Sequence, residues 1–338
     1  MPHREQALRH WLQDELKLPL EDLQPASSDA SFRRYFRVFL PDGLTRIAMD
    51  APPPQEDTRP FVRIAAQLRG LGLNAPVVHA AEPEQGFLLL DDLGQQAYLS
   101  CLDAESVNAL YGDAMQALLQ LQQCQDDGSL PRYDAVLLRN EMQLFVDWFL
   151  LRHLGLDLDA ELGLESIFAN LVASAQAQPQ VCVHRDYHSR NLMHLTQDNP
   201  GVIDFQDAVW GPITYDLVSL LRDCYIDWPR AQVEDWVHHY HQNALATGLL
   251  QDYPQAQDFA QFLHWFDWMG VQRHLKAIGI FSRLHHRDGK SGYLGDIPRT
   301  LSYVREVSSR YAELAPLHAF IAQIVDPAWQ ALQEGQAA

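Results

Sequence analysis

Residues 181–207 read VCVHRDYHSRNLMHLTQDNPGVIDFQD, and this stretch decides the fold. Two short apolar runs, Val181–Val183 and Gly201–Ile203, predict two buried strands. Asp186 follows the first run and Asp204 follows the second, while Asn191 lies five residues after Asp186. The stretch therefore brings two carboxylates and one amide to the ends of neighbouring strands.

This spacing is typical of kinase-type phosphoryl transfer. An acceptor alcohol needs one carboxylate to take its proton, and Asp186 is the candidate for that catalytic role. A triphosphate needs Mg²⁺, which prefers oxygen ligands, and Asn191 and Asp204 are the candidate ligands. The sequence thus predicts ATP and Mg²⁺ as cofactors.

The segment, continued through Gly211-Pro212 and Tyr215-Asp216-Leu217, resembles the aminoglycoside phosphotransferase-like small-molecule kinases. Within them it is most similar to the bacterial anomeric sugar kinases, and residues 267–294 carry the same likeness. The resemblance implies an α+β, two-lobed protein-kinase-like fold. We expect an antiparallel β N-lobe over 1–92, which covers the nucleotide phosphates, and a mostly helical C-lobe over 93–338, which holds the catalytic loop and the sugar.

Residues 21–50 predict strands around the turn Pro41-Asp42-Gly43, and Val77–His79 with Phe87–Leu90 predicts a second hairpin. A helix over about 58–71 is expected between them. The resemblance places a phosphate-covering loop at Ser27–Ser31, including Ser28, although this loop lacks glycine. It also places the adenine-contacting hinge at Leu90 and Asp92.

The first lobe lacks the lysine that protein kinases use to bind phosphate. The chain has lysine only at 17, 276 and 290, and Met49 occupies the matching strand position. We expect Arg33, Arg34 or Arg37 to supply the missing charge, against the alternative that these are solvated strand residues. Strand alternation predicts Arg33 and Arg37 on one face and Arg34 on the other.

Candidate acceptor-binding residues lie near the catalytic segment and in a later helix. They are His188, Arg190, Asp207, Trp210, Trp268 and Arg273. Residues 270–290 form a basic run in an acidic chain, which predicts either a solvated helix face or an anion-binding surface. Asp216 is expected near a helix start, where a carboxylate is favourable. The resemblance implies that it braces the catalytic loop, and we interpret it as structural rather than catalytic.

Composition limits the possible partners and location. The net charge of −19 argues against nucleic-acid binding. Neither a transmembrane run nor a secretory signal is apparent, and the four cysteines have no metal or disulfide spacing. We expect a cytoplasmic protein with reduced thiols, no membrane association and no obligate protein partner.

The predicted function is ATP-dependent phosphorylation of the anomeric hydroxyl of a small amino sugar, N-acetylmuramate and/or N-acetylglucosamine, in cell-wall sugar recycling. One alternative is an aminoglycoside or small amino-alcohol phosphotransferase. An alternative of another class is an inactive nucleotide-binding scaffold, motivated by the missing lysine and glycine. A protein kinase is disfavoured, because no Ala-Pro-Glu segment closes an activation loop.

Overall fold

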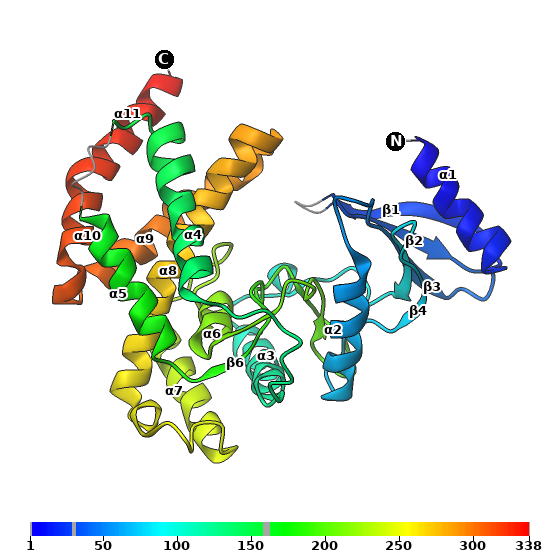
Figure 1. Cartoon of the computed structure of the whole chain (residues 1–338), viewed down its shortest axis with the longest axis horizontal. Coiled ribbons are helices and arrows are strands. Elements are labelled where there is room, and N and C mark those ends of the chain that lie inside the picture. The colour runs from blue at the N-terminus through cyan, green and yellow to red at the C-terminus, as the bar shows by residue number, and fades with distance from the viewer. Residues whose placement is uncertain (1, 29–31, 158–162, 338) are drawn as a thin grey trace. The chain divides into compact units, whose positions relative to one another are not determined.

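The chain forms two compact units in the computed structural model, which describes residues 2–28, 32–157 and 163–337 (Figure 1). The first unit contains residues 1–120 and 190–207, and the second contains 121–189 and 208–338. The expected boundary between 92 and 93 stays a prediction. The predicted α+β class is confirmed, since one unit is built on an antiparallel sheet and the other is mostly helical.

The first unit is organised around a five-stranded sheet in the order β1-β2-β3-β5-β4, with antiparallel neighbours. The strands are β1 (Asp22–Ser28), β2 (Arg34–Phe39), β3 (Thr45–Asp50), β4 (Val78–Glu82) and β5 (Phe87–Asp91). Both predicted hairpins are present. The second hairpin requires Gly86, whose φ is +77° and where a Cβ would lie 1.9 Å from the Ala51 carbonyl oxygen.

Helices complete the first unit. α1 (Pro2–His10) continues as a π-helical turn (Trp11–Glu15), and together they place Leu8, Trp11 and Leu12 against one face of the sheet. α2 (Thr58–Gly70) buries Phe61, Ile64, Ala65 and Leu68 on one face, and its bounds confirm the predicted helix. The remaining elements are a 3₁₀ turn (Tyr98–Ser100), α3 (Val107–Gln122), β7 (Leu192–Met193) and β8 (Gly201–Val202).

The second unit is built around α8 (Phe259–Asp288), a helix of 30 residues that packs among its neighbours (Figure 1). Its other α-helices are α4 (Ala135–Leu144), α5 (Leu164–Gln176), α6 (Thr214–Leu221), α7 (Arg230–Ala246), α9 (Ile297–Ser308), α10 (Ala315–Phe320) and α11 (Asp326–Ala337). Its strands are β6 (Gln180–Val183) and β9 (Val209–Pro212), which pair with each other. Its π-helical segments are Phe145–His153 and Ile321–Val325, and its 3₁₀ turns are Pro254–Gln257, Ser291–Asp296 and Ala312–Leu314.

The core of the second unit consists of apolar side chains from these helices. Phe145, Phe149, Phe168, Leu275 and Ile278 are among its members. Among the described residues, no helix is both long and apolar enough to cross a bilayer.

Close helix packing gives a test of this arrangement at Gly279. A Cβ there would lie 2.3 Å from the Leu144 carbonyl carbon, whereas a Cβ at Gly270 of the same helix would meet nothing nearer than 3.7 Å. Gly279→Ala should therefore destabilise the protein by at least about 2 kcal/mol, because the backbone must move apart. Gly270→Ala should be neutral or stabilise by up to about 1 kcal/mol. Urea unfolding measures the free energy of unfolding of both variants. Equal changes in the two variants would contradict the close packing at Gly279.

Candidate active site

The segment between β6 and Arg190 is held by two buried aspartates of the second unit. The Asp216 carboxylate, in the first turn of α6, accepts the backbone N–H of His184 at 2.6 Å and of Arg185 at 3.0 Å. The Asp223 carboxylate accepts the backbone N–H of Ser189 at 3.0 Å and also the Ser189 hydroxyl. Burial raises the pKa of Asp216 to about 7 despite its two hydrogen bonds. Asp216 thus braces the catalytic loop, as interpreted from the sequence.

Asp186 lies between these two anchor points. Burial alone raises the pKa of its carboxyl, but the charges of Lys276, His188, Arg185 and Arg273 together outweigh burial and lower the pKa below its usual value of 3.8. Asp186 is consequently ionised at neutral pH. An ionised carboxylate in a fixed loop is able to accept a proton from a hydroxyl group.

A buried ionic cluster positions the cations near Asp186. Glu141 of α4 accepts hydrogen bonds from Arg185 and from the Tyr133 hydroxyl, and it pairs with Lys276 of α8 at 3.0 Å. Burial raises the pKa of Glu141, but Lys276 and Arg185 lower it below its usual value of 4.5. Lys276 also donates to the Tyr215 hydroxyl at 2.9 Å. The sequence analysis missed Glu141, because its partners are far away along the chain.

Asp204 and Asn191 come together in the first unit. The Asn191 side-chain amide donates to Asp204 Oδ2 at 3.3 Å, and the Ile203 backbone N–H donates to the Asn191 carbonyl at 3.1 Å. Gln206 Nε2 donates to Asp204 Oδ1 at 2.9 Å, and Arg33 Nη2 donates to the same oxygen at 3.3 Å. Asp204 has a φ of +64°, a strained value that is common at functional sites. The carboxylate and amide oxygens fit a hard cation such as Mg²⁺.

The three strand arginines have different partners. Arg34 pairs with buried Asp50, and Arg37 pairs with Asp92 at 2.5 Å and donates to the Gly94 carbonyl at 3.0 Å. Arg33 is buried just before β2 and pairs with Asp204 at 3.3 Å. Met49 occupies the position opposite Tyr35 and Leu88, buried within the sheet.

The other expected nucleotide contacts lie at the ends of two strands. Leu90 is buried in β5 opposite Ile47, and Asp92 follows that strand. Ser28 ends β1, but its side chain and residues 29–31 of the expected phosphate loop lie outside the described residues. A nucleotide-binding role for these residues stays a prediction.

The six expected acceptor contacts lie in different environments. The His188 ring lies edge-on to Tyr225 at 5.3 Å in the second unit, while Arg190 and Asp207 are exposed in the first. Trp210 is in β9, with Arg132 over its ring. Trp268 and Arg273 are buried in α8, so the first part of the basic run 270–290 is not a solvated face, whereas Arg287 near its end is exposed. Trp268 packs against His264, and Arg273 Nη1 lies 3.6 Å from Cys224 Sγ.

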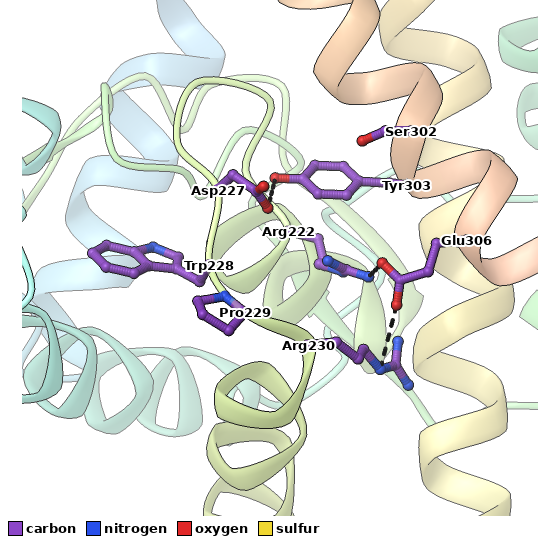
Figure 2. Close-up of a pocket in the computed structure, with 8 residues that line it drawn as sticks. All are labelled: Arg222, Asp227, Trp228, Pro229, Arg230, Ser302, Tyr303 and Glu306. Carbon is purple, nitrogen blue, oxygen red and sulfur yellow. Dashed lines mark hydrogen bonds and ion pairs between the residues drawn. The ribbon is translucent and has the colours of Figure 1, made fainter.

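A pocket of about 320 Å³ lies in the second unit, next to the C-terminal end of α6 (Figure 2). It is lined by Arg222, Asp227, Trp228, Pro229, Arg230, Ser302, Tyr303 and Glu306. The Tyr303 hydroxyl in the pocket lining lies 3.2 Å from the backbone carbonyl oxygen of Asp223. The carboxylate of the same Asp223 holds Ser189, so the pocket lining is connected to the loop that carries Asp186. The sequence analysis did not select this pocket, because its lining residues come from two segments that are far apart along the chain.

Within the pocket, arginines and carboxylates balance each other. Arg222 stacks on the Tyr303 ring at 4.6 Å and pairs with Glu306, as Figure 2 shows. Arg230 lies 3.9 Å from Glu306 and pairs more closely with Asp267 at 2.5 Å. The pocket therefore offers aromatic surface and hydrogen-bonding groups rather than a single strong charge.

An antiparallel sheet, a helical unit and acidic residues after two short strands define a protein-kinase-like phosphotransferase. The chain belongs to the phosphotransferase enzyme family, whose model matches residues 22–259, and it is a kinase. It is 48% identical to the N-acetylmuramate/N-acetylglucosamine kinase of Pseudomonas putida, over 95% of this chain and 96% of that protein. The Neisseria meningitidis protein of the same name is 44% identical, over 95% of this chain and 96% of that protein.

A solved structure shares the fold at much lower sequence identity. An ADP-bound aminoglycoside phosphotransferase has a TM-score of 0.55 and 17% identity, covering 89% of this chain and 98% of that one. The predicted family and kinase-like fold are thereby confirmed.

The buried cluster around Glu141 predicts a large effect on stability. Glu141→Gln should destabilise the protein by about 3–5 kcal/mol, because Arg185 and Lys276 would remain buried without their carboxylate. Because folding lowers the pKa of Glu141, its stabilisation is complete above pH 4.5 and is lost as the pH falls through the folded-state value. The difference between wild type and variant should therefore shrink in acid, as measured by denaturant unfolding across pH.

Glu165→Gln is the matched control, because Glu165 pairs with Arg139 at the surface. It should cost much less than Glu141→Gln, because solvent screens an exposed ion pair. Similar losses for the two variants, or a difference that is constant down to low pH, would contradict the role assigned to Glu141.

Proposed function

We propose that this kinase transfers the γ-phosphoryl group of ATP to the anomeric hydroxyl of N-acetylmuramate and/or N-acetylglucosamine. The observation that carries the proposal is the ionised Asp186, fixed in its loop by Asp216 and Asp223, within a chain 48% identical to a protein of that activity. The reaction would recycle cell-wall sugars in the cytoplasm, where ATP is available.

In the proposed mechanism, Asp186 accepts the proton of the sugar hydroxyl as that oxygen attacks the phosphoryl group. Asn191 and Asp204 would hold Mg²⁺, which when bound neutralises charge on the triphosphate. No covalent enzyme intermediate is needed, so the protein acts by positioning the reactants and balancing charge. The hydrogen bonds from Asp216 and Asp223 to the loop supply that positioning.

Arg33 is proposed to supply the phosphate contact that a strand lysine makes in protein kinases. Its guanidinium already lies 3.3 Å from Asp204, a proposed metal ligand, and arginine binds phosphate with two parallel hydrogen bonds. Arg34 and Arg37 have carboxylate partners away from Asp204.

The pocket around Trp228 is proposed to bind the acceptor. A tryptophan ring presents an apolar surface to a pyranose. The Arg222 and Arg230 side chains would bind the lactyl carboxylate of N-acetylmuramate while keeping their ion pairs with Glu306 and Asp267. Two arginines and two carboxylates line the pocket, so it has no net negative charge that would favour a polycationic aminoglycoside. The balanced charge is compatible with both the acidic and the neutral amino sugar.

The test of this function is a comparison of kcat/KM for N-acetylmuramate, N-acetylglucosamine and kanamycin with Mg²⁺ and ATP. The amino sugars should be preferred. The product should be an acid-labile anomeric phosphate that no longer reduces copper, because the reducing end is blocked. Phosphorus NMR of the product checks the linkage.

Asp186→Asn is the control in the same assay. It should lower kcat by about 10²–10⁴-fold, the usual contribution of a positioned proton acceptor, while ATP binding persists. A product that still reduces copper, a preference for kanamycin, or a variant that retains more than about a third of kcat would contradict the proposal.

A separate prediction concerns Arg33. Arg33→Ala should raise the KM for ATP, by about tenfold if one charge-assisted hydrogen bond is lost, because the side chain meets the phosphates. Arg34→Ala is the matched control, and it should change this KM much less because Arg34 is paired with buried Asp50, which is not among the expected nucleotide contacts. Initial-rate kinetics at saturating sugar measures both values, and equal shifts would remove Arg33 from the phosphate site.

A further inference from the structure

Three histidines gather in the helical unit, outside the segments assigned to phosphoryl transfer. His153 ends the helical segment Phe145–His153, and His285 and His286 lie in the last turn of α8. One ring nitrogen from each lies within 4.8 Å of the other two. We propose that these residues form a binding site for a divalent transition metal of the Zn²⁺ class.

The spacing of the nitrogens is close to what such an ion requires. A tetrahedral Zn²⁺ site with bonds of about 2.0–2.1 Å places its ligand nitrogens about 3.3–3.4 Å apart. His153 Nδ1 and His286 Nε2 are already 3.1 Å apart. His285 is partly exposed, and its nitrogen needs to move by no more than about 1.5 Å to complete the set.

Zn²⁺ binds the ring nitrogens of histidine when the imidazole ring is neutral. In the hydrogen bond between His153 and His286, one of the two facing nitrogens carries a proton. On metal binding this proton moves to the other nitrogen of the same ring, so both facing lone pairs become available without a net change in charge.

The surroundings also support a cation at this position. His285 Nδ1 lies 2.9 Å from Ser291 Oγ, an arrangement that orients the ring and leaves Nε2 as the ligand atom. The carbonyl groups at the end of α8 carry partial negative charge, which favours a cation near its last turn. Trp329 and Phe149 pack against His153 on its apolar side. Arg152, which acts on His286, opposes the added charge.

A metal ion there would connect the end of the segment Phe145–His153 to the end of α8. Both belong to the core of the second unit. The expected role is structural, because none of the three histidines is among the residues assigned to the nucleotide or the acceptor.

The test is calorimetric titration of Zn²⁺ into the full chain, without a histidine tag, stripped of metal and held in excess Mg²⁺ to occupy the Asp204 site. Wild type should bind one Zn²⁺ per chain, and saturating Zn²⁺ should raise the Tm by a few degrees. His285→Gln and His286→Gln should weaken binding by at least about tenfold. Both side chains are partly exposed, so these variants test the site without disturbing the core.

His238→Gln, at an exposed histidine of α7, is the matched control and should bind Zn²⁺ as wild type does. Phosphoryl transfer with Mg²⁺ and ATP should stay unchanged in His286→Gln. Absence of saturable Zn²⁺ binding by wild type would overturn the proposal. Wild-type affinity in both His285→Gln and His286→Gln would overturn it equally.

Discussion

The chemistry of this kinase depends on hydrogen bonds from one short loop to two buried aspartates. The backbone N–H groups of His184, Arg185 and Ser189 need acceptors in the protein interior, and Asp216 and Asp223 provide them. Asp216 accepts two of these backbone donors, and Asp223 accepts both the N–H and the hydroxyl of Ser189, which fixes the path of the chain on both sides of Asp186. Burying a carboxylate disfavours its charged form, and this is why the pKa of Asp216 is raised.

The same segment depends on cations that come from elsewhere in the second unit. Arg185 and Lys276 share Glu141, so two positive charges are buried with a counter-ion and remain close enough to keep Asp186 ionised. The basic run in α8 thus contributes buried charges in an acidic protein, instead of the solvated face that its composition alone would suggest. Arg287, at the end of that run, is exposed and pairs with Asp288.

The fold and the proximity of Asn191 to Asp204 were predictable because their signals are local in the sequence. Two strand-like runs with Asp186, Asn191 and Asp204 at fixed spacing indicate the chemistry, and the stripe Phe61, Ile64, Ala65 and Leu68 indicates α2. Glu141 and the pocket around Trp228 were not predictable, because their partners lie tens of residues away. Which of the three strand arginines reaches Asp204 depends on side-chain geometry that alternation alone does not specify.

Met49 has a practical consequence for chemical labelling. An ATP analogue that acylates a lysine beside the phosphates needs an amine at that strand position. Here the position holds a thioether, Lys17 lies outside the sheet strands, and Lys276 is buried against Glu141. Surveys of kinases by such reagents would therefore overlook this enzyme, while inhibitors designed to bridge a strand lysine would lack their anchor.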